Sequence, residues 1–207
     1  MPDARSPAPL VLQLASASPR RRELLQQLGI APVVLEVPAP PGEDEPRLAG
    51  ETPLDYVRRT ARDKAQRALA WRTAEGLPRL PLLAADTCVS MDQQIFGKPQ
   101  DAADARRILQ ALSGRCHDVR TAVVLVGLDG QLHEALSETR VWMQPLSAAQ
   151  IEAYCASPEP YGKAGAYGIQ GRAGAFVSRI DGSYSGVMGL PLHDTARLLV
   201  QAGLMAG

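Results

Sequence analysis

The sequence has almost no lysine and no excess of positive or negative charge. Of its 22 basic residues, 19 are arginine and three are lysine (Lys64, Lys98 and Lys163), and 22 acidic residues balance them. A formal net charge of zero argues against a surface built mainly for nucleic acid or for an anionic membrane. We therefore expect neither as a partner. The three lysines are candidate phosphate-binding residues, because an ammonium is a compact charge that often binds phosphate and arginine does not replace it in every geometry.

Long apolar runs and cysteine motifs are also missing. No stretch of the sequence approaches the ~20 apolar residues of a transmembrane helix. The polar, proline-rich residues 1–9 lack the continuous apolar segment of a signal peptide. Three cysteines, an odd number, form no CxxC or metal-finger spacing. We therefore expect reduced thiols in a cytoplasmic protein, and a loose arm over residues 1–9 before a single domain over residues 10–207.

Several familiar catalytic motifs are absent. The sequence has no GxSxG elbow, no Walker motif and no GxGxxG after a strand, and its three histidines lack metal-ligand spacing. The apolar pattern instead predicts an α/β fold with hairpins and crossovers, hence a mixed twisted sheet with flanking helices. Strands are expected over residues 10–14, 80–85, 118–128, 131–143 and 175–180, with a short hairpin over 87–96. Helices are expected to span residues 19–28, 52–71, 101–113 and 191–203, with a short one starting at a capping box over 147–150.

The stretch "ASASPRRRELL" predicts a helix start with unfavourable charges. Ser18 is a good N-cap and Pro19 suits the first helical position. Yet residues 20–22 are all arginine, although a helix N-terminus carries partial positive charge. A bound phosphate would explain them, with hydroxyl donors from Ser16 and Ser18. The alternative is that the arginines extend into water, at a cost of some tenths of a kcal/mol.

On the phosphate hypothesis, replacing Arg21 with Gln should leave the free protein as stable or more stable. The reason is that a cation would leave the positive pole of an isolated helix. Arg22 lies about 100° further round the helix and is expected to matter less for phosphate binding.

Further polar residues lie at positions typical of a ligand site. Lys64 falls at the edge of the inward stripe of its helix, although a lysine that reaches to solvent is the commoner case. Asp86 follows the apolar strand "LPLLAA", where ligand groups often lie, although it could simply form a turn. Lys98 lies between a glycine and a proline, and Lys163 and Gln170 lie in a glycine-rich loop. This set suits a polyphosphate ester with a divalent metal.

Five long stretches resemble the Maf family of nucleoside triphosphate pyrophosphatases. They are "LASASPRRRELLQQLGI", "GETPLDYVRRTARDKA", "AADTCV…GKP", "LSGRCHDVRTAV" and "KAGAYGIQGRAGAFVSRIDGSYSGVMGLPL". The resemblance implies two lobes around a long cleft, similar to inosine triphosphate pyrophosphatases. It also implies metal-dependent hydrolysis of a nucleoside triphosphate to the monophosphate and pyrophosphate. The loop "KAGAYGIQG" resembles the branch that hydrolyses dTTP and UTP.

The resemblance also implies roles for individual residues. Asp86 matches the family's proton acceptor, and the specificity positions match Arg20, Thr87 and Gln170. Glu45, Lys64 and Lys98 match further polar active-site residues, with Glu43 and Asp44 as alternatives to Glu45. We predict that Mg²⁺ or Mn²⁺ is held by Asp86 and Glu45. The residues predicted to bind phosphate are Ser16, Ser18, Arg21, Lys64, Lys98 and Lys163.

Two alternative functions stay open at this point. One is a non-enzymatic, nucleotide-binding regulator of cell division, a role historically attached to the family name. The other is a pyrophosphatase for a different, modified nucleotide. A homodimer is compatible with the sequence, which does not determine the oligomeric state.

Overall fold

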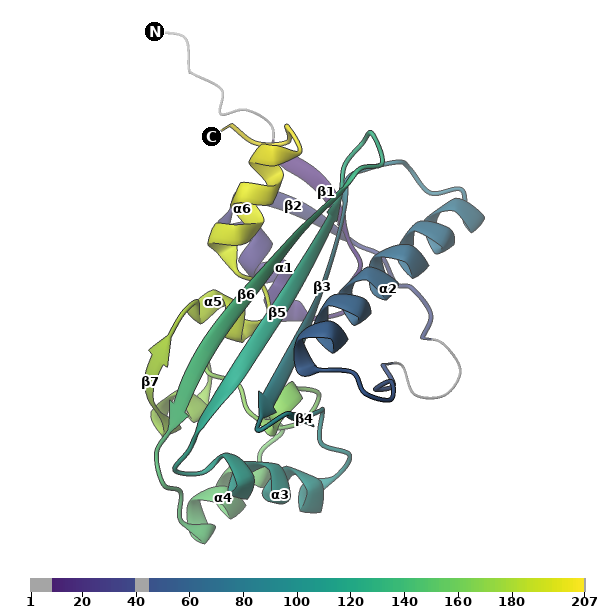
Figure 1. Ribbon diagram of the computed structural model, residues 1–207. Coiled ribbons are helices and arrows are strands. Elements are labelled where there is room, and N and C mark those ends of the chain that lie inside the picture. Colours follow the sequence, from purple (N-terminus) through teal and green to yellow (C-terminus); the bar gives the residue numbers. More distant parts are fainter. Residues whose placement is uncertain (1–8, 40–44, 207) are drawn as a thin grey trace, which may run out of the picture.

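The chain alternates strands and helices around one sheet (Figure 1). The computed structural model describes residues 9–39 and 45–206, so Glu43, Asp44 and all but Pro9 of the expected arm lie outside it. The elements are β1 (Leu10–Leu14), α1 (Pro19–Gln27), β2 (Ile30–Val34), α2 (Pro53–Ala74), β3 (Leu82–Met91), β4 (Gln94–Phe96), α3 (Ala102–Leu112), β5 (Cys116–Val126), β6 (Leu132–Met143), α4 (Ala148–Cys155), β7 (Val177–Asp181), α5 (Tyr184–Met188) and α6 (Leu192–Gln201). Two 3₁₀ turns, Ala164–Ala166 and Arg172–Phe176, lie in the glycine-rich loop.

The predicted mixed sheet is confirmed. Seven strands form one sheet in the order β2-β1-β3-β5-β6-β7, with β4 paired to β3. Strand β1 runs parallel to β2 and β3, and the other pairs are antiparallel. Strand β2 was not predicted because Pro32 interrupts its apolar run, and it occupies the edge of the sheet, where proline is tolerated. The short helix α5 was also missed.

The expectation that a strand ends just before Asp86 is wrong. Strand β3 continues to Met91 because β5 pairs with it continuously, from Leu82 opposite Val126 to Ser90 opposite Asp118. Asp86 therefore lies in the middle of a strand and does not form a turn.

Helices cover both faces of the sheet. Helix α2 packs on one face over the apolar side chains of β3 and β5, whereas α1 and α6 pack on the other (Figure 1). A third apolar cluster, at the far end of the long strands, joins α3 and α4 to β3 and β4. The molecule thus has two lobes along one sheet. One lobe contains α1, α2 and α6, and the other contains α3 and α4. In the described ranges, no helix combines the length and the apolarity needed to cross a bilayer.

A gap in strand pairing lies between these lobes. Strand β1 pairs with β3 only as far as Leu14 opposite Leu83, and β4 begins to pair at Val89. No described strand therefore pairs with residues 84–88 on that side of β3. The chain leaves β1 at this point toward α1. Ends of parallel strands where neighbouring connections diverge are common ligand sites in α/β proteins.

Candidate active site

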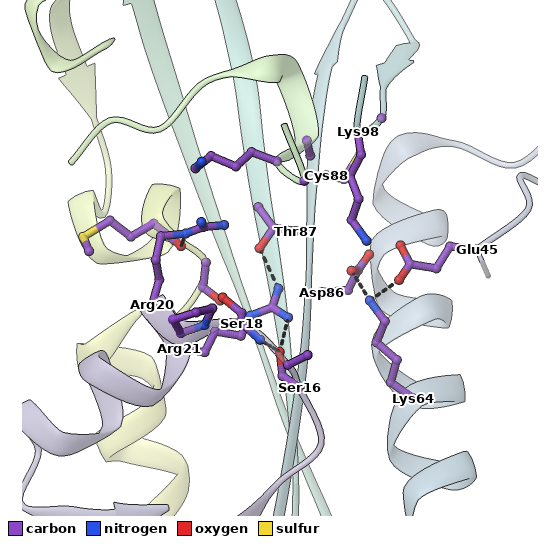
Figure 2. Close-up of a pocket in the computed structure, with 18 of the residues that line it drawn as sticks. Ser16, Ser18, Arg20, Arg21, Glu45, Lys64, Asp86, Thr87, Cys88 and Lys98 are labelled. Atoms are coloured by element: carbon purple, nitrogen blue, oxygen red, sulfur yellow. Dashed lines mark hydrogen bonds and ion pairs between the residues drawn. The ribbon is translucent and has the colours of Figure 1, made fainter. Parts of the chain in front are cut away.

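A cleft of about 1220 Å³ opens at this gap. Its walls come from α1 on one side and α2 on the other, with β3 between them (Figure 2). All the residues given a site role by sequence analysis line it: Ser16, Ser18, Arg20, Arg21, Glu45, Lys64, Asp86, Thr87, Lys98, Lys163 and Gln170.

Lys64 joins two carboxylates at the α2 side of the cleft. Its Nζ lies 2.6 Å from Asp86 Oδ1 and also forms an ion pair with Glu45 Oε1 (Figure 2). The Lys64 side chain is only 16% exposed, so it does not extend into bulk water. Such a partly buried ion pair needs its partners, because removing one would leave an uncompensated charge. Lys98, which is exposed, points toward the same two carboxylates from the opposite side.

Thr60 holds the second oxygen of Asp86, and sequence analysis missed it. Its Oγ1 lies 2.6 Å from Asp86 Oδ2 and 2.9 Å from the Tyr56 carbonyl oxygen. The single hydroxyl proton goes to the carboxylate, which is the stronger acceptor. Thr60 and Lys64 are four residues apart on α2 and therefore share one helix face. That spacing was the signal that could have found Thr60.

A partly buried ion pair holds the segment that carries Glu45 against α2. Arg59 donates two hydrogen bonds to the carboxylate of Glu51, at 2.6 and 3.0 Å, and a third at 2.9 Å to the Pro46 carbonyl. The hydroxyl of Tyr56 donates at 3.2 Å to the carbonyl of Glu45 itself. The Arg59 hydrogen bonds hold the pKa of Glu51 below its ordinary value. Glu45 thus reaches Lys64 from a segment that side chains of α2 fix in place.

On the other side of β3, Arg21 of α1 forms hydrogen bonds to three separate parts of the chain. Because successive side chains of a strand point to opposite faces, Asp86 faces α2 and Thr87 faces α1. Arg21 donates to Thr87 Oγ1 at 3.1 Å, to Ser16 Oγ at 3.1 Å and to the Gly189 carbonyl at 2.8 Å. Burial lowers the pKa of Arg21, whereas the nearby charges of Asp86 and Glu45 raise it.

The arginines at the start of α1 also meet the end of α5. Arg20 donates at 3.3 Å to the Met188 carbonyl, and Arg21 donates to the carbonyl of Gly189, the C-cap of α5. Cations are favourable beside such unpaired terminal carbonyls. Three protein acceptors use the Arg21 guanidinium, so we expect the free protein to need this residue, contrary to the expectation from helix charge alone. A role for Arg21 in phosphate binding stays a prediction.

Positive charges crowd the side of the cleft lined by the glycine-rich loop. Burial lowers the pKa of Lys163, and the nearby charge of Arg20 lowers it further. Lys163 Nζ donates to the carbonyl of Glu159. Gln170 is exposed in the same loop and lines the cleft. An anion bound between Arg20 and Lys163 would relieve their repulsion.

Two further cleft residues have pKa values that exclude a charged form at neutral pH. Burial and the nearby charge of Asp86 raise the pKa of Cys88 to about 12, so its thiol is not a thiolate nucleophile. Burial, with the charges of Asp86 and Glu45, raises the pKa of Tyr56. The Tyr56 hydroxyl therefore acts as a neutral hydrogen-bond donor.

Asp86 and Glu45 are the carboxylates suited to a divalent cation. Their oxygens converge on one cation already, the Lys64 ammonium, which shows that this position attracts positive charge. Within the described ranges, no three His, Cys, Asp or Glu side chains are grouped as a metal site. The donor set fits a hard ion such as Mg²⁺, which is commonly bound by one or two carboxylates together with substrate phosphates and water.

Sequence comparisons relate this chain to a known group of proteins. The model of the family described as "Maf-like protein" matches residues 11–202. A "dTTP/UTP pyrophosphatase" of Bordetella avium is 65% identical over 193 residues, which is 93% of this chain and 96% of that protein. The protein of the same name from Ralstonia nicotianae is 52% identical, over 93% of this chain and 94% of its own length.

Solved structures give weaker likenesses. A Mycobacterium abscessus protein titled nucleoside-triphosphatase / dITP/XTP pyrophosphatase aligns with a TM-score of 0.38 and 16% identity, over 67% of this chain and 77% of that chain. A HAM1 protein from Coxiella burnetii aligns with a TM-score of 0.40 and 19% identity, over 65% and 73%. The α/β assignment therefore rests on the sheet described above.

Replacing Glu51 with Gln should destabilise the protein by about 1.5–3 kcal/mol at neutral pH, the range for hydrogen bonds to a charged group. Because the folded-state pKa of Glu51 is lowered, its contribution is fully present above the ordinary glutamate pKa of about 4.3. It is lost as the pH falls through the lower folded-state pKa. Urea unfolding between pH 7 and pH 3 should show the gap between wild type and variant closing at the acid end. A gap independent of pH would contradict this assignment.

Replacing Arg21 with Gln should lower the unfolding free energy of the free protein by about 1.5–3 kcal/mol, because three acceptors lose a charged donor. Arg22 is exposed, and its replacement by Gln should change stability by less than about 0.5 kcal/mol. Urea unfolding of both variants without nucleotide measures the difference. Equal stabilities would mean that the Arg21 contacts contribute nothing to the fold.

Proposed function

This chain belongs to the Maf-like protein family, and we propose that it hydrolyses dTTP and UTP to the nucleoside monophosphate and pyrophosphate. The observation that carries the proposal is the convergence of Asp86, Glu45 and Lys64 at the gap in the sheet, opposite the cations of α1 and the glycine-rich loop. The names of the curated relatives support the choice of substrate. The phosphates would lie between these two charged walls.

Asp86 is the residue proposed to accept the proton of the attacking water. Thr60 and Lys64 each bind one of its oxygens, which fixes the plane of the carboxylate. An ionised carboxylate held in this way can orient a water molecule and take its proton. Attack at the α-phosphorus would then release pyrophosphate. Positioning and charge stabilisation supply most of the rate in phosphoryl-transfer chemistry.

We propose Asp86 and Glu45 as the residues that hold a divalent cation, Mg²⁺ or Mn²⁺. When bound, such an ion would neutralise negative charge at the scissile α–β linkage. Lys64 already supplies positive charge to both carboxylates, and Lys98 points toward them. These two ammonium groups are therefore suited to contact phosphate oxygens beside the carboxylates.

The other wall is suited to the remaining phosphate charge and to the base. Arg20 and Lys163 repel each other in the free protein, and an anion between them would remove that cost. Ser16 and Ser18 also line the cleft. Gln170 can accept a hydrogen bond from N3–H of thymine or uracil and donate one to a ring carbonyl. Thymine and uracil share that edge, so the proposed discrimination between them is weak.

A cytoplasmic location is part of the proposal. It is supported by Cys88, Cys116 and Cys155, which are free thiols in the described structure. The nucleoside triphosphate is the proposed partner.

The purified protein should release pyrophosphate from dTTP and UTP faster than from CTP, ATP, GTP or 7-methyl-GTP. The reason is the hydrogen-bonding pattern that Gln170 offers to a base. A coupled pyrophosphate assay across this panel, with chromatography of the products, measures both preference and bond position. Diphosphate plus orthophosphate would contradict attack at the α-phosphorus. Tight nucleotide binding without turnover would instead favour a non-enzymatic regulator.

Replacing Asp86 with Asn should preserve the fold and reduce kcat by at least about 10²–10⁴-fold, the usual contribution of a positioned general base. Loss of a metal carboxylate would add to this loss. Asp118→Asn is the matched control, because Asp118 lies on β5 and does not line the cleft. Initial rates with dTTP at saturating metal, with thermal melts of both variants, make the comparison. Near-normal turnover in folded Asp86→Asn would reject both roles assigned to Asp86.

A further inference from the structure

The proposed base-selecting residue lies in a short turn with no regular secondary structure of its own. The Gly171 amide donates at 3.0 Å to the Gly168 carbonyl, which closes a turn that contains Gln170. The Gln170 side chain is exposed and lines the cleft. The position of its amide group therefore depends on what fixes the backbone on either side.

One phenol and one carboxylate fix that backbone. On the near side of the turn, the Gly168 amide donates at 3.2 Å to the Tyr154 hydroxyl. On the far side, the amides of Arg172 and Ala173 donate to Glu159 Oε2 at 3.1 Å and Oε1 at 3.3 Å. Tyr154 in turn donates at 3.0 Å to Glu159 Oε1, which joins the two anchors. Tyr154 lies at the end of α4, and Glu159 follows it.

Two glycines make this close approach of backbone and side chains possible. A Cβ atom on Gly171 would lie only 2.3 Å from Glu159 Oε1, so a side chain there would displace the carboxylate. A Cβ atom on Gly168 would lie 3.1 Å from Lys163 Cε and 3.3 Å from Gln170 Nε2. The same anchor also reaches a residue predicted to bind phosphate, since Lys163 donates to the Glu159 carbonyl.

The carboxylate of Glu159 is suited to this role at neutral pH. Partial burial raises its pKa, but hydrogen bonds from Arg172, Ala173 and Tyr154 outweigh that effect and hold the pKa below the ordinary value. Glu159 is therefore ionised, and charged hydrogen bonds are roughly twice as strong as neutral ones.

We propose that Glu159, linked through Tyr154, is a positioning residue for base selection: it holds residues 168–173 so that the Gln170 amide meets the base in one orientation. Neither side chain lines the cleft, so they act through the loop and not by touching the nucleotide. This inference rests on the proposed function. Loss of the anchor should affect discrimination between bases more than the chemistry at Asp86, because Asp86 is held by α2.

The test replaces Glu159 with Gln, which keeps the size of the side chain but leaves one oxygen to accept and turns an NH₂ group toward backbone donors. The ratio of kcat/KM for dTTP to that for dCTP should fall by about tenfold or more, the effect of losing one charged hydrogen bond. Hydrogen exchange should accelerate at the amides of residues 168–173. Glu152→Gln is the matched control, because Glu152 lies on α4 and is exposed, with its ion pair to Arg106 at 2.5 Å. The control should change neither quantity.

The outcomes separate this inference from the proposed function. If wild type shows no preference for dTTP over dCTP, the proposed function fails, and base selection by this loop fails with it. If wild type is selective and Glu159→Gln keeps the same ratio, the positioning role alone is overturned. Should Glu159→Gln fail to fold, Tyr154→Phe removes a single hydroxyl. It should then lower the same ratio and release the Gly168 amide, and an unchanged ratio would overturn the role equally.

Discussion

The unequal lengths of β1 and β3 decide where this protein can bind a ligand. Strand β1 ends at Leu14, opposite Leu83, whereas β3 continues to Met91 along β5. Among the described strands, none pairs with residues 84–88 on that side of β3, and the cleft opens there. Alternation along the strand then sends Asp86 toward α2 and Thr87 toward α1. One short stretch of a long strand therefore presents groups to both walls of the cleft.

Helix α2 organises the acidic side of that cleft. One face of this 22-residue helix carries Thr60 and Lys64, which bind the two oxygens of Asp86. Arg59 holds the segment that brings Glu45 to Lys64. Side chains of this one helix therefore position Asp86, supply its positive partner and hold the segment that carries Glu45. Rigid support of this kind is what proposed phosphoryl-transfer chemistry requires, since positioning supplies much of its rate.

The cationic side of the cleft is not organised by one helix. Arg21 is satisfied by protein acceptors, including the terminal carbonyl of α5, so part of the positive charge at the start of α1 has a structural use. Arg20 and Lys163 still repel each other, which leaves this wall favourable for an anion. The loop that completes it has little secondary structure and depends on Tyr154 and Glu159 for its shape.

Much of the architecture and the membership of the site followed from the amino-acid order, because their signals are local or lie in long motifs. Capping residues such as Thr52, Asp101 and Ser147 mark helix starts, and alternating apolar patterns mark the long strands. The residues that the sequence motifs indicated do line the cleft. Other features were decided only by tertiary structure. Strand β3 continues beyond Asp86 because β5 supplies pairing partners from far along the chain. Arg21 finds an acceptor in Gly189, which lies 168 residues away in sequence yet beside it in space. Glu159 has no unusual sequence context, and the four-residue spacing from Lys64 was the only local signal for Thr60. What distinguishes both residues is the oxygen or amide that folding places next to each.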